Sequence, residues 1–180
     1  MNYLRAQALN NLWANHRLLS SCAALSEEQY RAARTGFFPS IQATLRHILE
    51  VDAYYFAALI EDLPGQNAPP PVELPLDELI DRQRQQDRAL ADFCARLKDS
   101  DAMRTVRLIR AEGEVLERID RILLHLFEHQ IHHRGQVHCM LSGTCIAPPQ
   151  LDEFFLVADR PFRRRDLQAL GLTENDLWPG

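Results

Sequence analysis

The sequence lacks long apolar runs. No stretch approaches the ~18 consecutive apolar residues that a membrane-spanning helix requires. Polar residues interrupt the opening segment MNYLRAQALNNLWANHRLL, so that it contains no signal-peptide core. We therefore expect a cytoplasmic protein with no membrane partner.

The sequence also lacks paired cysteine motifs. Cys22, Cys94, Cys139 and Cys145 are scattered, without the CxxC spacing that is typical of zinc and redox sites. A chain of this size does not need disulfides to stabilise its core. We expect reduced and mostly buried thiols.

Positive charge does not predominate, and lysine is scarce. Of the 20 basic residues 19 are arginine, and the formal net charge is -5. Nucleic acid is therefore excluded as the main partner, because phosphate binding requires a concentrated positive field. The arginine excess indicates nothing about mechanism.

What is present is ordinary globular composition. With 180 residues at 46% hydrophobic, the chain is long enough for one well-buried core. We expect a single domain over residues 1–180, with its core at 2–157 and an irregular C-terminal tail at 158–180. The tail holds a cluster of arginines that should be solvated, namely Arg160, Arg163, Arg164 and Arg165.

Apolar residues recur at helical spacing in four long segments. These segments are residues 2–24, 41–62, 76–98 and 117–142. Ser40 is a good N-cap for the second segment, and Gly143 ends the fourth. The connection at 63–75 contains five prolines, which exclude a helix there. The pattern predicts an all-α four-helix bundle with a long crossover.

Two shorter segments accompany the bundle. Residues 103–110 alternate in the manner of a strand, and Ala111-Glu-Gly113 can turn the chain back onto 114–116. A short β-hairpin is therefore expected before the last long helix. Residues 147–157 should pack back as a short turn or helix.

Five of the seven histidines lie between residues 125 and 138. At 100° per residue, His133 lies inside the apolar sector of its helix, and His129 lies on the margin one turn earlier. His125 and His132 fall on the polar side, and His138 points elsewhere. Imidazoles at i and i+4 can coordinate one metal ion. Alternatively, both are core-edge histidines that bond to backbone or water.

A competing motif overlaps this pair. His125-Leu-Phe-Glu128-His129 matches the H-x-x-E-H pattern of inverted zinc proteases, in which both histidines bind zinc and the glutamate is the general base. His125 and Glu128 point toward the charged face, so a distant carboxylate would have to close over an exposed site. The spacing therefore favours His129 and His133.

A metal site needs at least a third ligand, and two histidines remain. His16 lies on the apolar stripe of the first helix beside Trp13 and Leu19, which is typical of a core or interface histidine. His47 lies on the second helix, which is apolar on most sides and should be enclosed. It is the better candidate.

Four sequence patches together resemble the DinB/YfiT-like metalloenzymes. They are Trp13-Ala-Asn15, Leu45-Arg-His47-Ile-Leu-Glu-Val-Asp52, His129-Gln-Ile-His-His133-Arg-Gly-Gln136 and Pro148-Pro-Gln-Leu-Asp152. The resemblance covers about residues 3–157, and H-x-x-x-H-R-G-Q is its most specific element. It implies a four-helix bundle in which His47, His129 and His133 bind one divalent transition metal ion, nickel or zinc. It also implies a homodimer.

Three neutral imidazoles leave the metal with its full charge and an open position, a pattern typical of catalytic sites. A water or thiol bound there would lose its proton more readily. Some relatives in the wider superfamily use the site to activate a low-molecular-weight thiol such as mycothiol or bacillithiol. The resemblance therefore implies a metal-dependent thiol transferase or hydrolase that acts on a small molecule. The alternative is a non-catalytic stress-response or metal-sensing dimer.

Several neighbours of the three histidines are candidates for substrate binding. Gln136, beside His129 on the wheel, would reach the open metal position. Arg134 would hold an anionic group, although a salt bridge or a dimer contact is the simpler role for it. Asp52 matches the family pattern, either as a substrate contact or as an acceptor behind a ligand. Glu50, one turn beyond His47, is a candidate fourth ligand.

Overall fold

A computed structural model describes residues 3–61 and 73–178. Most of these residues are helical, so the predicted all-α class is confirmed. In chain order the elements are α1 (Tyr3–Cys22), α2 (Glu27–Arg31), α3 (Ile41–Leu59), α4 (Leu76–Arg96), α5 (Asp99–Ala102), β1 (Thr105–Arg110), β2 (Gly113–Arg118), α6 (Ile119–Leu141), the 3-10 helix η1 (Val157–Asp159), α7 (Arg160–Leu170) and α8 (Glu174–Leu177).

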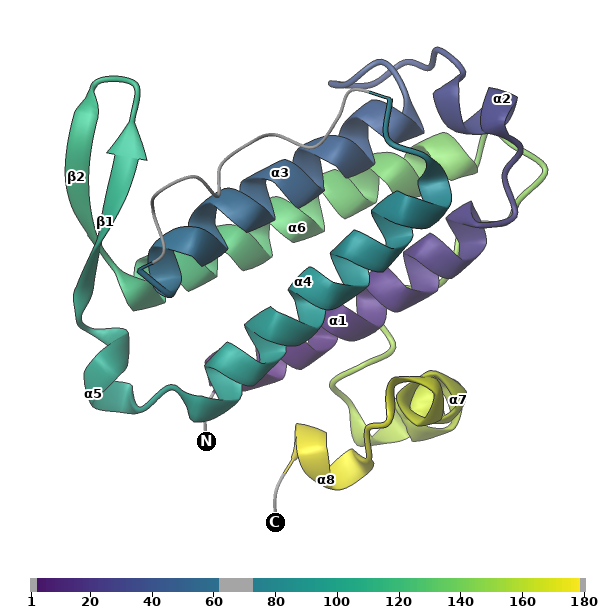
Figure 1. The fold of residues 1–180 in the computed structure, drawn as a ribbon. Helices are drawn as coiled ribbons and strands as arrows, with labels where there is room; N and C mark the ends of the chain where they lie inside the picture. Colours follow the sequence, from purple (N-terminus) through teal and green to yellow (C-terminus); the bar gives the residue numbers. More distant parts are fainter. Residues whose placement is uncertain (1–2, 62–72, 179–180) are drawn as a thin grey trace.

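The four long helices form the predicted bundle. α1 packs against α4 and α6, and α3 packs against α4 and α6. α3 and α4 run in the same direction, opposite to α1 and α6 (Figure 1). The predicted crossover at 63–75 lies mostly outside the described residues. The Ser40 hydroxyl accepts from the Ala43 amide, which confirms the expected cap of α3.

Apolar side chains of the four helices form two buried clusters, one at each end of the bundle. One cluster surrounds Trp13 and Leu123, and the other surrounds Ile41 and Leu141. Each long helix has apolar residues of one half in one cluster and apolar residues of its other half in the second cluster. The side chains in the middle of the bundle belong to neither cluster.

The predicted hairpin is confirmed. β1 and β2 pair antiparallel from Thr105–Arg118 to Arg110–Gly113 and project from one end of the bundle (Figure 1). Val106 and Leu108 are buried, and the Tyr54 hydroxyl of α3 donates to the Ile109 carbonyl at 2.8 Å. These contacts fasten the hairpin to α3.

The expectation of an irregular tail after residue 158 is wrong. α7 and α8 occupy this segment, and Gly171 ends α7 with φ of 68°, a conformation that glycine adopts without strain. Arg163 is fully buried rather than solvated, because it pairs with Glu174 at 2.6 Å and donates to the Leu156 carbonyl at 2.7 Å. Because Arg163 and Glu174 are 11 residues apart, the spacing of charges along one helix does not predict this ion pair.

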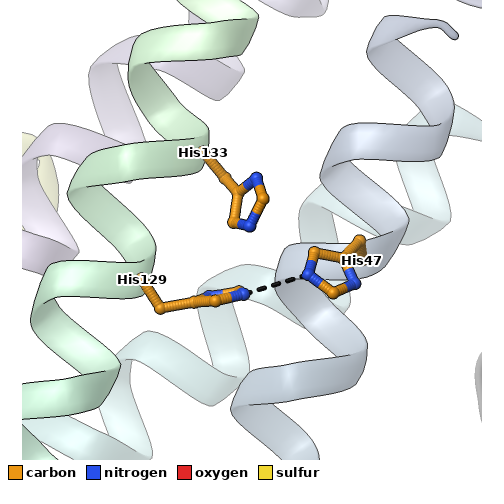
Figure 2. Close-up of side chains that lie close together, drawn as sticks. All are labelled: His47, His129 and His133. Atoms are coloured by element: carbon orange, nitrogen blue, oxygen red, sulfur yellow. Dashed lines mark hydrogen bonds between the residues drawn. The ribbon is translucent and has the colours of Figure 1, made fainter. Parts of the chain in front are cut away.

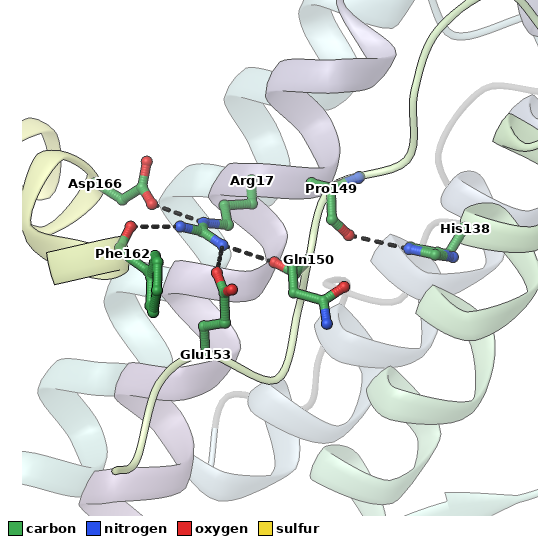
Figure 3. A network of polar contacts seen from close by, with 7 residues as sticks. All are labelled: Arg17, His138, Pro149, Gln150, Glu153, Phe162 and Asp166. Carbon is green, nitrogen blue, oxygen red and sulfur yellow. Dashed lines mark hydrogen bonds and ion pairs between the residues drawn. The ribbon is translucent and has the colours of Figure 1, made fainter. Parts of the chain in front are cut away.

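Arg17 of α1 joins the C-terminal segment to the bundle (Figure 3). Its guanidinium donates to the Asp166 and Glu153 carboxylates at 2.7 and 3.0 Å. It also donates to the carbonyls of Gln150 and Phe162 at 2.8 and 2.6 Å. Residues 147–157 therefore pack back onto α1, as expected, but mostly as irregular chain instead of the predicted short turn or helix.

The cysteines and the apolar character of the helices bear on two further expectations. Cys22 and Cys94 are buried, but Cys139 and Cys145 are exposed, so the expectation of mostly buried thiols holds for two of the four. Across residues 3–61 and 73–178, no helix is both long and apolar enough to cross a membrane.

Candidate metal centre

Three histidines from two helices converge between α3 and α6 (Figure 2). His47 lies in the second turn of α3, and His129 and His133 lie one turn apart on α6. One ring nitrogen of each lies within 4.8 Å of the other two. The Nε2 atoms of His47 and His129 are 3.0 Å apart. The arrangement could therefore hold a metal ion.

An aromatic pair covers two of the three rings. Phe38, just before α3, lies with its ring centroid 4.5 Å from that of His47 and 5.6 Å from that of His133. Phe37 packs edge-on against Phe38 at 5.0 Å. Their apolar surface reduces the access of water to the imidazoles from this side, which weakens the solvation of any charge there.

Burial and proximity keep the three imidazoles neutral. Desolvation, together with the neighbouring His133 and His47, lowers the pKa of His129 to about 3. Desolvation also lowers the pKa of His47 and of His133. Imidazole coordinates a metal in its neutral form, so all three are ligand-competent at neutral pH.

A glutamine orients one of the rings. The Nδ1 of His133 lies 2.9 Å from the Gln136 side-chain oxygen, and the Gln136 amide nitrogen lies 3.0 Å from Nε2 of His132. Because a glutamine oxygen accepts, Nδ1 of His133 carries the proton and its Nε2 keeps a free lone pair. Gln136 thus acts behind a histidine ring in this structure.

The family model named DinB family matches residues 2–161. The chain belongs to the DinB family. A comparison with curated proteins found no match. The family match ends at the start of α7, so most of α7 and all of α8 follow the part of this DinB chain that the family model describes.

Asp52 and Arg134 lie in a polar layer that the DinB bundle buries between its two apolar clusters. All four long helices contribute to it, with Asn11 and Asn15 from α1, Asp52 from α3, Gln83 and Asp87 from α4, and Gln130 and Arg134 from α6. We call these seven residues the polar layer. Gln130 and Arg134 each follow a histidine of the triad directly in sequence, so the layer and the triad share α6.

Amide side chains hold the two carboxylates of the layer. Gln83 donates to Asp52 at 2.7 Å and to Asp87 at 3.1 Å, and Asn15 donates to Asp87 at 2.9 Å. Gln130 donates to Asp52. Desolvation raises the pKa of Asp52 to about 7 and that of Asp87 well above its ordinary value. The layer therefore resists holding two negative charges.

Arg134 is the positive charge of the layer. It donates to the side-chain oxygens of Asn11, Asn15 and Gln130. Hydrogen bonds to amides thus take the place of the salt bridge that was one of the two roles expected for it, the other being a dimer contact. Arg134 and Asp52 are 5% and 2% exposed, so within this chain neither reaches open solvent beside the triad.

The remaining candidates lie apart from the triad. Glu50 pairs with Arg46 at 3.7 Å and is outside the metal-ligating cluster that the described residues form. His125 and Glu128 are exposed, and His129 groups with His47 and His133 rather than with them. The described structure thus does not assemble the inverted zinc-protease motif. His16 is half-buried and lies on α1, which contributes no residue to the triad.

Sequence reasoning missed most of the polar layer and the aromatic cover. Gln130 lies within the broad apolar sector of α6, and a polar residue in that position is a signal of a buried hydrogen-bonded side chain. Asp87 and Gln83 carry a similar signal on α4. Phe37 and Phe38 carried none, because they lie in a connecting segment without helical periodicity.

Proposed function

We propose that the chain binds one divalent transition metal ion, nickel or zinc, through His47, His129 and His133. The observation that carries this proposal is the convergence of three neutral imidazole nitrogens within 4.8 Å. Imidazole donors suit nickel and zinc better than they suit magnesium or calcium, which prefer oxygen. Orientation of His133 by Gln136 is the kind of support that ligating histidines usually have.

A bound metal ion of this kind would act as a Lewis acid that makes a coordinated water or thiol more acidic. The chain's own residues prepare the place for it. Phe38 excludes water from one side, and Gln136 fixes the proton of His133 on Nδ1. Because the three ligands are neutral, the protein adds no negative charge that would reduce the acidity of the bound group.

We infer a metal-dependent thiol transferase or hydrolase that acts on a small molecule. Gln136 adjoins the triad, where its side-chain oxygen would hold the His133 ring from behind rather than contact a substrate. Asp52 and Arg134 would act as positioning residues, because the polar layer holds α3 and α6 in register. This role replaces direct substrate contact for both.

A non-catalytic, metal-sensing homodimer is the second candidate. Leu124 and Ile131 of α6 are 58% and 51% exposed and lie seven residues apart on one helix face. Such a face would suit a second copy of the chain. The metal would then stabilise the α3–α6 packing that supports the dimer.

Turnover and assembly measurements separate the two candidates. Metal-loaded protein that transfers a low-molecular-weight thiol to an electrophile, or hydrolyses a test substrate, and loses this activity in His133→Ala supports the enzyme. A chelator-dependent change of molecular mass in light scattering, without turnover of any thiol or ester substrate, supports the sensor. His138→Ala, which removes an imidazole of the same helix that contacts the Pro149 carbonyl and not the triad, serves as the matched control in both assays.

A further inference from the structure

A cavity lies away from the triad, on another side of the bundle. It has a volume of about 310 Å³ and lies between α1, α4 and α7. Its lining consists of Leu12, His16, Arg84, Arg88, Ala169 and Leu170. None of these residues belongs to the triad or to the polar layer, so the cavity is a separate place in the fold.

The polar part of this lining is basic. Arg84 and Arg88 lie one turn apart on α4, and His16 of α1 joins them. Desolvation lowers the pKa of His16; among the neighbouring charges Asp166 raises it, and Arg84 and Arg17 lower it. Asp166 itself is engaged by Arg17 at 2.7 Å. None of the six lining residues is acidic.

The two guanidinium groups keep donors for a ligand. One nitrogen of Arg88 donates to the Leu170 carbonyl at 2.9 Å, which fixes the side chain at the end of α7. Arg84 has a long ion pair with Asp81 at 3.8 Å, and its side chain is 46% exposed. Each guanidinium carries five N–H donors, so most of these remain for an acceptor.

The other part of the lining is apolar. Leu12 and Leu170 are 3% and 6% exposed, and Ala169 lies beside them. Ala169 and Leu170 come from α7, beyond the residues that the DinB family model matches. The C-terminal segment therefore turns a basic surface of α1 and α4 into a cavity with one apolar side.

We propose that this cavity binds a small organic anion, with a carboxylate or phosphate group on Arg84 and Arg88 and an apolar body against Leu12 and Leu170. Guanidinium groups match both kinds of oxyanion through paired hydrogen bonds. The volume lies at the lower end of the range for small-molecule sites. The inference does not depend on the function proposed for the triad.

Titration of the full-length protein with benzoate, inorganic phosphate and benzyl alcohol, followed through the His16 ring resonances in NMR spectra, tests the proposal. Benzoate and phosphate should each give a saturable shift, and benzoate should bind more tightly because its ring covers apolar surface. Benzyl alcohol, which has the ring without the charge, should give none. Arg84→Ala should weaken benzoate binding about tenfold or more, the usual effect of losing a charge-assisted hydrogen bond.

Arg82→Ala is the matched control, because Arg82 lies on the same helix with the same 46% side-chain exposure but pairs with Glu78 outside the cavity. It should bind benzoate as the unchanged protein does, and so should His129→Ala. Absence of a saturable shift with either anion would overturn the proposal. Equal weakening in Arg82→Ala and Arg84→Ala would also overturn it, as would loss of the shift in His129→Ala, which would place the anion at the triad.

Discussion

The Nε2 atoms of His47 and His129 lie 3.0 Å apart, although 82 residues separate the two histidines in the chain. In this pair one nitrogen donates and the other accepts. The His133 ring, with its centroid 4.4 Å from that of His129, lies beside them. A cation at this point would allow all three lone pairs to face one centre, which no arrangement of protons on neutral rings can do.

Removal of a triad histidine is expected to abolish metal binding. Protein purified without a nickel-affinity step should contain about one metal ion per chain, and His129→Ala or His133→Ala should reduce this to about a tenth or less, because two neutral imidazoles form a much weaker site than three. Elemental analysis by mass spectrometry measures the content. His138→Ala, on the same helix but in contact with the Pro149 carbonyl instead of the triad, should keep its metal. Unchanged metal in both triad variants would refute the assignment.

The sequence could predict the separation of His129 and His133 from the other histidines of α6, because helical periodicity alone determines which side chains share a face. It could place His47 on an enclosed helix but not at 3.0 Å from His129, because that distance depends on the packing of α3 against α6. The resemblance to the DinB family supplied the third histidine, and the packing brings it to the other two.

Acid should destabilise the metal-free protein through His129. Its pKa is lowered to about 3 in the folded chain, mainly by desolvation, whereas an unfolded chain binds the proton near pH 6.5. The unfolded state therefore binds more protons between these values, and stability falls as the pH falls below about 6.5. From this group alone the free energy of unfolding should be about 2 kcal/mol lower at pH 5 than at pH 7.

Denaturant unfolding of the chelator-treated protein at pH 5 and pH 7 measures this slope. His129→Asn should show a shallower dependence on pH, because asparagine does not titrate. His138→Asn removes an imidazole of the same helix that contacts the Pro149 carbonyl instead of the triad, and should keep the original dependence. An identical slope in His129→Asn and the unchanged protein would show that His129 does not titrate as described.

The polar layer shows where sequence reasoning reached its limit. Asp52 was found through a family motif, but its partners Gln83 and Gln130 come from helices 31 and 78 residues away. Arg134 lies far round the wheel from His133, and helical position alone does not distinguish a buried arginine from a surface one. Burial of Arg163 was missed for the same reason, since its acceptor Glu174 lies on another helix.

Asp52 is expected to give the opposite dependence on pH. Desolvation raises its pKa to about 7 in the folded state, so the folded chain binds more protons than the unfolded one above pH 4, and stability is lost as the pH rises toward 7. Asp52→Asn should remove this loss. Relative to the unchanged protein, the free energy of unfolding of the variant should therefore rise by a few kcal/mol from pH 4 to pH 8.

A neutral amide suits this position, because the side-chain oxygen of the Asp52→Asn variant could still accept from Gln83 and Gln130. In the described residues two buried oxygens have no hydrogen-bond partner, Oδ1 of Asp52 and Oε1 of Gln83. Asp52→Asn would place an amide nitrogen at the position of Oδ1, and this nitrogen would be a donor. Urea unfolding at both pH values gives the comparison, with the exposed Asp92→Asn on α4 as control. A variant that is less stable than the unchanged protein at pH 8 would contradict the expected neutral preference.

Loss of the Arg17 side chain should release the C-terminal segment from the bundle. Arg17 is 15% exposed at its side chain, stacks over Trp13 at 4.5 Å and holds Glu153 and Asp166. Arg17→Met leaves these carboxylates without their cation, and we expect a loss of about 2–3 kcal/mol. Hydrogen exchange should increase in α7 while the middle of α6 stays protected.

Arg82→Met, which breaks a surface pair with Glu78, should change stability by less than about 1 kcal/mol. Equal exchange in α7 before and after Arg17→Met would show that apolar packing of Leu167 and Leu170 alone holds the segment in place.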